Sequence, residues 1–163
     1  KFLVFIDVKT ETAMNIWKWL SFSKLSNQDL YKILKLREEV FVLEQQCFYL
    51  DIDDLDYDAW HLMALNSTQS LIAYLRVVEP GIKYQEPALG RVIVRQQNRS
   101  VGLGNKLVLE GVRRTCIQFP GQNIRISAQQ HLAGFYRRLG FKETNKCYLE
   151  DGFPHVEMYW ETE

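Results

Sequence analysis

A glycine-bearing turn between a strand-like and a helix-like segment constrains the fold of this chain more than any other feature of its sequence. The segment 89–95 is rich in β-branched residues, which is typical of a well-buried strand. Beyond the turn at 99–104, apolar residues recur at the spacing of one helix face: Leu103, Leu107, Val108, Gly111 and Val112. Pro120-Gly121 ends this helix. A strand, a glycine turn and a helix in this order predict an α/β unit.

The turn, Arg99-Ser-Val-Gly102-Leu-Gly104, has the composition of an anion-binding loop. Glycines let the backbone approach a ligand closely, and the first N–H groups of a helix attract phosphate. The plainer interpretation is a tight strand-to-helix turn without a ligand. A Walker loop is excluded because Asn105 follows Gly104 where that motif has lysine. A dinucleotide fingerprint is excluded because Leu107 stands at its third glycine.

The rest of the chain continues the same alternation of elements. Ser26-Asn-Gln-Asp29 resembles a capping box, and the apolar residues after it predict a helix over 27–42. The other expected elements are a hairpin of 61–65 and 70–78, a strand at 123–128, a short helix at 132–139 ended by Gly140, and a closing hairpin of 142–149 and 155–160. This order predicts an α/β fold with a mixed sheet.

The chain has 163 residues and no repeat, low-complexity tract or Gly/Ser linker, so we expect a single domain over 14–163. The first thirteen residues precede Met14, at which a natural chain could start. The segment 1–13 is therefore either an added or optional extension or, because Phe2 to Ile6 has strand-like composition, an extra edge strand.

Charge and cysteine usage limit the partners and the location. Lys and Arg number 20 and Asp and Glu number 20, so no net field draws the chain to nucleic acid or anionic lipid. The longest apolar runs fall far short of the roughly 18–20 residues of a membrane span. Cys47, Cys116 and Cys147 form no C-x-x-C pair and are odd in number, which favours a reducing, cytoplasmic location. We expect a monomer or homodimer with no nucleic-acid or membrane partner.

The acidic run from Asp51 to Asp58 does not have the spacing of a calcium loop. Counted from Asp51, position six is Asp56 rather than glycine, and position twelve is Leu62 rather than glutamate. The histidines are scattered without the paired spacing of a zinc site. We therefore expect no metal.

Two motifs give the chain a family resemblance. Val94-x-Gln-x-x-Arg99-x-x-Gly102-x-Gly104 resembles motif A of the GNAT acetyltransferase superfamily, which binds the CoA pyrophosphate. Ala133-Gly-Phe-Tyr136-Arg-Arg-Leu-Gly140-Phe141 is similar to the second signature of that superfamily, a helix that bears a tyrosine before Gly-Phe. The chain departs from the pattern at Gln96, where many members have proline, and at Ser100, where glycine is frequent. These departures affect the loop geometry and leave the backbone amides in place.

Further segments resemble the ElaA-like branch of the same superfamily: Arg37-x-x-Val-Phe41-Val-x-Glu44-Gln45-x-Cys-x-Tyr49-x-Asp51-x-Asp53, His61, Gly90-Arg-Val-Ile-Val94, Ala128-Gln129 and Glu150-Asp-Gly-x-Pro-His155. The resemblance extends from Ile16 to Trp160. It implies the GNAT fold, with a mixed, mostly antiparallel sheet of six to seven strands and about four helices.

The resemblance also implies a function. The chain is expected to be an N-acetyltransferase that passes an acetyl group from acetyl-CoA to a small-molecule or peptide amine, by direct attack in a ternary complex. The implied cofactor-binding residues are Ile93, Val94, Arg99, Val101, Gly102, Leu103 and Gly104, with a strand amide near Ile93 or Val94 holding the carbonyl oxygen. A non-catalytic acyl-CoA sensor or interaction module is the alternative, and transfer of a longer acyl group is a third possibility.

The resemblance assigns Tyr136 to the proton that the departing CoA thiolate takes up, whereas helical spacing alone favours a core role for this residue. An amine with a pKa of about 10.4 must also lose a proton before it attacks. Glu44 is the first choice as base, and its plainer interpretation is a solvated helix end. His61, Asp51 and Asp53 are the other expected substrate-side residues, and His61 can equally be a merely hydrogen-bonded strand histidine.

Overall fold

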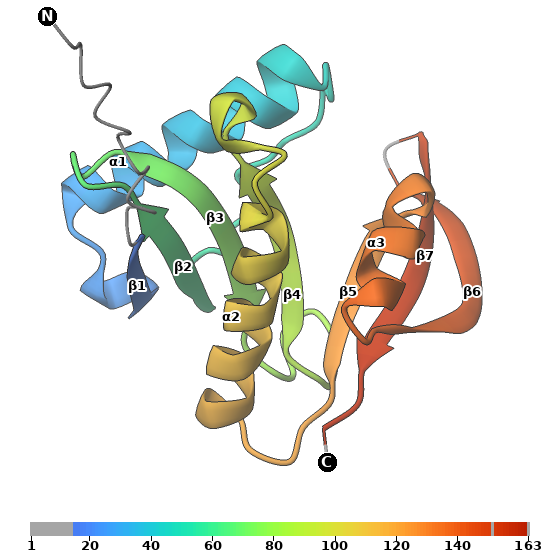
Figure 1. Cartoon of the computed structure of the whole chain (residues 1–163). Helices are drawn as coiled ribbons and strands as arrows, with labels where there is room; N and C mark the ends of the chain where they lie inside the picture. Colours follow the sequence, from blue (N-terminus) through green and yellow to red (C-terminus); the bar gives the residue numbers. More distant parts are fainter. Residues whose placement is uncertain (1–14, 151, 163) are drawn as a thin grey trace, which may run out of the picture.

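The residues described by the computed structural model of Figure 1 form a seven-stranded sheet with helices on both faces. The structure describes residues 15–150 and 152–162, so segment 1–13 lies outside the described residues. The strands are β1 (Ile16–Ser21), β2 (Ala59–Leu65), β3 (Leu71–Val78), β4 (Ala88–Val94), β5 (Ile124–Gln129), β6 (Lys142–Glu150) and β7 (Phe153–Trp160). The α-helices among the described residues are α1 (Asn27–Arg37), α2 (Leu103–Gln118) and α3 (Ala133–Arg138).

The sheet is mixed and mostly antiparallel, in the order β1-β2-β3-β4-β5-β7-β6, which confirms the predicted fold class. The described residues contain three α-helices rather than about four. The two predicted hairpins are present, as are the strand before the glycine turn and the strand after the helix that follows the turn. Strand β1 was not predicted, and it pairs with β2 from Ile16↔Leu65 to Ser21↔Trp60.

Helix α1 begins at the predicted cap. The Ser26 hydroxyl oxygen accepts a hydrogen bond from the backbone N–H of Asp29 at 3.0 Å. The Asp29 carboxylate does not complete a capping box, because it accepts hydrogen bonds from Ser26 Oγ and Lys18 Nζ instead. The helix continues beyond Arg37 as a π-helical segment, Glu38–Glu44, so the predicted helix is present but its last part has changed pitch.

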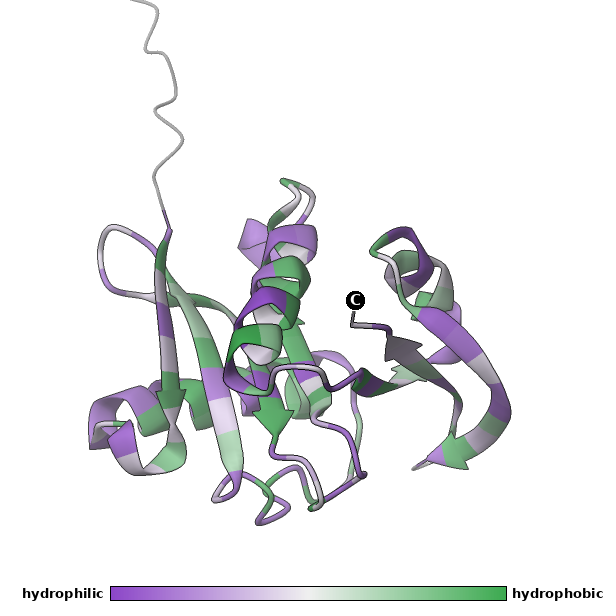
Figure 2. Ribbon diagram, turned by 90° about the horizontal axis from the view of Figure 1, so that it is seen from below, coloured by the Kyte–Doolittle hydropathy of each residue, from purple (hydrophilic) through white to green (hydrophobic). Residues whose placement is uncertain are grey.

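The two faces of the sheet have separate apolar cores. On one face α2 lies close to the strands, because a Cβ atom on Gly111 would stand only 2.7 Å from the side chain of Leu75. On the other face Ile33 and Leu36 of α1 pack with Met63 and Tyr74. In Figure 2 the central strands are mainly hydrophobic, whereas the edge strand β6 is largely hydrophilic. This pattern follows from β2 and β3 being covered on both faces.

The sheet separates between β4 and β5. These strands are parallel and share a single paired position, Ala88↔Arg125, so no further pairing joins them along the rest of their length. Figure 1 shows β5, β7, β6 and α3 standing apart from β1 to β4 and α2. Because a parallel pair without its ladder leaves the strand edges unpaired, this separation exposes backbone of both strands to a ligand.

No helix among the described residues is long and apolar enough to cross a membrane.

Candidate active site

The 99–104 loop enters α2 through left-handed backbone. Ser100 has φ 68° and Gly102, the N-cap of α2, has φ 76°. Glycine adopts this conformation without strain, which explains why Gly102 stands there and why glycine suits the position of Ser100. No side chain caps the helix and its first turn contains no acidic residue. The N–H groups at the start of this 16-residue helix are therefore suited to bind an anion.

The two glycines of the loop differ in what they permit. A Cβ atom on Gly102 would meet nothing within 4 Å, so the backbone conformation and not crowding requires glycine there. A Cβ atom on Gly104 would lie 3.8 Å from Val94 and 3.9 Å from Phe135, which is ordinary contact. The start of α2 thus lies beside both β4 and α3. Leu103 anchors it in the core, whereas Val101 is exposed.

Arg99 and Glu44 meet at the same end of the sheet. Arg99 donates from Nη1 and Nη2 to the two carboxylate oxygens of Glu44, at 2.6 and 2.9 Å. It also donates from Nε to the carbonyl oxygen of Val94 at 2.9 Å. The structure therefore places the expected base on the expected phosphate-binding arginine, and Glu44 is not among the side chains that line the cavity described next.

A cavity of about 450 Å³ lies where β4 and β5 separate. One wall comes from β3, β4 and the segment 41–53, including Phe41, Cys47, Tyr49, Asp53, Arg76, Gly90, Arg91 and Val92. The other wall comes from β5, α3, β6 and β7, including Ser127, Gln129, Tyr136, Glu150, Phe153 and His155. Of the residues predicted for the site, this cavity brings together Tyr136 and Asp53.

Tyr136 belongs to both the core and the cavity. Its side chain is 7% exposed and makes edge contacts with Phe135 and Phe141. None of the described residues forms a hydrogen bond with its hydroxyl, and burial alone raises its pKa to about 12. A phenol in this state remains a proton donor throughout the neutral range and has its hydrogen-bonding capacity available for a ligand.

Strand β4 carries a bulge at the cavity. Gly90 pairs with Arg76 and Ile93 pairs with Tyr74, so Arg91 and Val92 stand opposite the single residue between them on β3. Arg91 has φ 52°, an uncommon value for a residue with a side chain. Gly90 to Val92 line the cavity, whereas Ile93 is buried against α1 and neither Ile93 nor Val94 is in the cavity wall. Sequence reasoning missed this bulge because its residues fit a regular strand.

His61 does not reach the cavity. Its side chain is fully buried, its Nε2 donates to the carbonyl oxygen of Asp56 at 3.1 Å, and its Nδ1 accepts from the Tyr74 hydroxyl at 2.8 Å. Burial lowers its pKa to about 4. The neutral imidazole therefore has both nitrogens engaged in hydrogen bonds within the protein.

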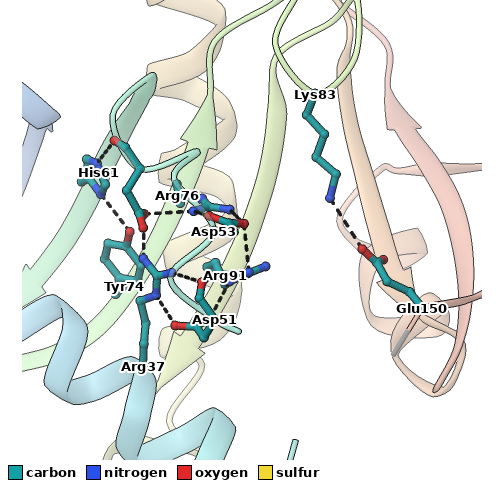
Figure 3. A network of polar contacts seen from close by, with 10 residues as sticks. Arg37, Asp51, Asp53, His61, Tyr74, Arg76, Lys83, Arg91 and Glu150 are labelled. Carbon is teal, nitrogen blue, oxygen red and sulfur yellow. Dashed lines mark hydrogen bonds and ion pairs between the residues drawn. The ribbon is translucent and has the colours of Figure 1, made fainter. Parts of the chain in front are cut away.

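The acidic run folds inward onto arginines and forms the network of Figure 3: Arg37, Arg76, Arg91, Asp51, Asp53 and Asp56. Arg37 is fully buried and donates to Asp51 and Asp56, at 2.7 Å each. Two nitrogens of Arg76 bind the two carboxylate oxygens of Asp53 at 2.6 and 2.8 Å. This network ties α1, β3 and β4 to the segment that lines one wall of the cavity.

The network satisfies the carboxylates that were expected to face substrate. Burial alone would raise the pKa of Asp53, but its hydrogen bonds to Arg76 and the charges of Arg76 and Arg91 outweigh that effect and lower it. Asp51 accepts hydrogen bonds from Arg37 and Arg91. Both aspartates thus have arginine partners inside the protein. Among the described residues, no group of three or more His, Cys, Asp or Glu side chains is arranged to hold a metal ion.

Comparison with known proteins agrees with this geometry. Residues 24–162 match the family model of the acetyltransferase (GNAT) domain. This chain belongs to the GNAT acetyltransferase family. It is 36% identical over 144 residues to the ElaA protein of Escherichia coli, covering 87% of this chain and 94% of ElaA. It is 39% identical over 142 residues to a UPF0039 protein of Synechocystis, covering 87% of this chain and 92% of that protein.

Solved structures of GNAT proteins show the same fold. The crystal structure of Escherichia coli ElaA superposes with a TM-score of 0.84 at 35% identity, over 91% of this chain and all of that one. An acyl-CoA N-acyltransferase from Pseudomonas aeruginosa superposes with a TM-score of 0.85 at 36% identity, over 90% of this chain and 99% of that one. The predicted resemblance to the GNAT superfamily and its ElaA-like branch is confirmed.

On the cavity wall opposite β4, sequence reasoning gave a role to Tyr136 alone. Ser127, Glu150 and His155 lie on this wall of the GNAT domain, although the segment from Glu150 to His155 contributed to the family resemblance. Strand alternation would have placed Tyr148 and Glu150 on one face of β6, and Phe153 and His155 on one face of β7. Strand alternation does not indicate which face of β6 and β7 lines the cavity.

Proposed function

We propose that this GNAT protein transfers an acetyl group from acetyl-CoA to an amine by direct attack in a ternary complex. One observation carries the proposal: a cavity is lined on one side by the β4 bulge and on the other by the largely buried side chain of Tyr136. The uncapped start of α2 lies next to β4 and α3, the elements that supply those two groups. Phosphate, carbonyl and sulfur sites therefore follow one another along the separation of β4 and β5.

The residues present fit the co-substrate. The N–H groups after Gly102 and the guanidinium of Arg99 suit its pyrophosphate. The bulge at Arg91 and Val92 interrupts the ladder to β3 and leaves backbone available to the acyl carbonyl. Tyr136 donates its proton to the departing sulfur, a contribution of about 10²- to 10⁴-fold for a general acid.

The amine must be neutral when it attacks. At pH 7 an alkyl amine with a pKa of about 10.4 costs roughly 4.6 kcal/mol to deprotonate. Turnover should therefore rise between pH 6 and 9, as either the amine or a protein base loses its proton.

A covalent route deserves its own test because Cys47 lines the cavity and is 5% exposed. Direct attack predicts that Cys47→Ser keeps most of its turnover and that double-reciprocal plots against the two substrates intersect. Parallel plots together with an inactive Cys47→Ser protein would establish an acyl-cysteine intermediate and contradict the ternary complex.

The deciding experiment measures thiol release from acetyl-CoA in the presence of single amines. Release that depends on the amine, with formation of the acetylated product seen by mass spectrometry, supports the proposal. Calorimetry on the same preparation gives the affinity for acetyl-CoA and for longer acyl-CoAs. Tight acyl-CoA binding without release to any amine would instead support the sensor function.

A further inference from the structure

The wall formed by β5, β6 and β7 carries a polar cluster that the proposed chemistry leaves unused: Ser127, Tyr148, Glu150 and His155. The strand register places them together, because His155 pairs with Tyr148 on one side and with Gln129 on the other. Ser127 and Glu150 lie two residues from those partners and so share their face. Three of the four, Ser127, Glu150 and His155, line the cavity.

The cluster fixes the Glu150 carboxylate. Tyr148 donates from its hydroxyl to Ser127 Oγ at 2.5 Å, and Ser127 donates to Glu150 Oε2 at 2.7 Å. Burial opposes ionisation, but the hydrogen bond from Ser127 and then the charges of nearby cations outweigh it and lower the pKa of Glu150. Glu150 therefore faces the cavity as a carboxylate with one oxygen held in place.

Glu150 differs from Asp53, the other carboxylate among the described residues that line the cavity. Asp53 is bound by Arg76 through two hydrogen bonds and by Arg91 through a third at 3.1 Å. Among the residues that the structure describes, Lys83 is the only cation paired with Glu150 Oε1, at 3.8 Å. Figure 3 shows the two side chains facing each other. This distance is too long for a hydrogen bond, so the carboxylate retains capacity for a cationic donor.

His155 places a hydrogen-bond acceptor next to the Glu150 carboxylate. Its Nδ1 lies 2.8 Å from the carbonyl oxygen of Phe153, so Nδ1 carries the proton and donates it. In the neutral ring Nε2 is then an acceptor, and it lies 4.0 Å from Glu150 Oε2. The side chain is only 12% exposed, and the ring stacks on Tyr148. Two acceptors that face each other at this separation leave room for one ammonium group to donate to both.

We infer that the acceptor is a primary monoamine with an apolar body, whose ammonium group binds between Glu150 and His155 on the cavity wall that also carries Tyr136. This inference rests on the proposed function. A single positive charge is favoured because Arg76, Arg91 and Lys83 also line the cavity and would repel a second one. An apolar body is favoured because Leu50 and Phe153, both exposed, line opposite walls.

The proton balance assigns a role to each group. Glu150 holds the ammonium, and His155 Nε2 takes one proton from it, so that the neutral nitrogen attacks the thioester carbon. The N–C bond forms and the C–S bond breaks, and Tyr136 gives its proton to the sulfur. The second proton of the amine nitrogen returns to the Tyr136 oxygen, and the proton on His155 leaves to solvent. One ammonium and one thioester thus become one amide, one thiol and one released proton.

The titratable and charged groups that face this pair come from three elements besides β7. Glu150 and Tyr148 face His155 from β6. Lys83 from the loop before β4 and Arg91 from β4 act on Glu150 by charge. The positive groups favour an ionised Glu150, which is the state that binding of an ammonium group requires.

The probes are phenethylamine, ethylamine and spermidine. We expect phenethylamine to have the highest kcat/KM of the three. Glu150→Gln should raise the KM for phenethylamine about tenfold or more, because it removes the charge that binds the ammonium, and should leave the Kd of acetyl-CoA unchanged. The matched control is Glu143→Gln, on the same strand and similarly exposed, at 38% against 40%. It pairs with Arg137 away from the cavity and should change neither constant.

His155→Gln tests the base. It should lower kcat at pH 7 by about 10²-fold, and the deficit should shrink above about pH 9, where the amine loses its own proton. A purely structural role would lower kcat equally at all pH values. Thermal denaturation of each variant identifies any that fails to fold.

Three results would overturn the inference: an unchanged KM in Glu150→Gln, a His155→Gln deficit that is independent of pH, or spermidine as the preferred acceptor. If the parent protein released no thiol with any amine, the proposed function would fail instead. The amine site is then decided by calorimetry of phenethylamine in the presence of CoA. Binding that Glu150→Gln weakens about tenfold supports the site, and equal or absent binding in both proteins overturns it.

Discussion

Arg99 donates two hydrogen bonds to the carboxylate of Glu44, at 2.6 and 2.9 Å, although the two residues are 55 positions apart in the sequence. The guanidinium that the family resemblance assigns to pyrophosphate is thus already occupied by a carboxylate of the chain. Both side chains are partly exposed, at 38% and 32%, so solvent screens the pair. Glu44 and a bound pyrophosphate would compete for the same donors.

Glu44→Gln should therefore act on co-substrate affinity rather than on the amine. An exposed pair contributes up to about 1 kcal/mol, so we expect the Kd of acetyl-CoA to fall by up to about fivefold with kcat nearly unchanged. Calorimetry and steady-state kinetics measure the two effects. Glu110→Gln is the control, because it removes a negative charge from an ion pair within α2. It should change neither the Kd of acetyl-CoA nor kcat. A large loss of kcat in Glu44→Gln would restore Glu44 as the base.

Gly102→Val should weaken acetyl-CoA binding about tenfold or more, because the φ of 76° is unfavourable for valine and the loop must shift. The same strain should lower the free energy of unfolding by about 1–2 kcal/mol. Gly104→Ala is the control, since its added Cβ makes only ordinary contacts. It should raise stability by up to about 1 kcal/mol with little change in Kd. Normal binding by Gly102→Val would mean that the loop is only a turn.

Tyr136→Phe should lower kcat by about ten- to a thousandfold, because it removes only the hydroxyl that protonates sulfur. Stability should change by less than about 0.5 kcal/mol, since no described residue bonds to that hydroxyl. With its pKa raised to about 12, Tyr136 should also cause no loss of activity up to pH 10. Kinetics and thermal denaturation on one preparation test both statements. Unchanged kcat, or a large loss of stability, would leave Tyr136 a core residue.

His61 should make stability depend on pH below neutrality. Its pKa is lowered from 6.5 to about 4 in the folded protein, so the unfolded chain takes up the proton first. The stabilisation is complete above pH 6.5 and is lost as the pH falls to 4, by up to about 3 kcal/mol. The lowered pKa values of Asp53 and Asp56 act below this window, under their ordinary value of 3.8. Urea denaturation at several pH values should show a flatter profile between 4 and 6.5 for His61→Gln.

Strand β1 could have been predicted from the local pattern of its residues. Trp17 and Trp19 alternate with Lys18, so that the tryptophans pack against the core beneath α2 and the lysine pairs with Asp29 of α1. This is the period of a half-buried strand, and it was available from the sequence. The π-helical segment after Arg37 was not, because nothing in the residue spacing distinguishes it from a further turn of α-helix.

The sequence by itself determined the features that depend on neighbours along the chain. Helix periodicity, the Ser26 cap, the hairpins and the left-handed turn at Gly102 each follow from residues a few positions apart, because backbone sterics and local hydrogen bonds act at that range. The family motifs lie in such segments, and they placed Tyr136 and the 99–104 loop.

Only the tertiary structure decided which polar groups meet. Glu44 was expected beside substrate and is hydrogen-bonded to Arg99. Asp51 and Asp53 were expected on the substrate side and bind Arg37 and Arg76. The Glu150 and His155 pair faces the cavity only because β4 and β5 separate after one paired position. The spacing of charged and hydrogen-bonding side chains along the sequence does not indicate which distant residue each of them contacts. Burial removes water from these groups, so each of them needs a hydrogen-bond or ion-pair partner inside the protein. The packing of the whole sheet determines which partners are close enough.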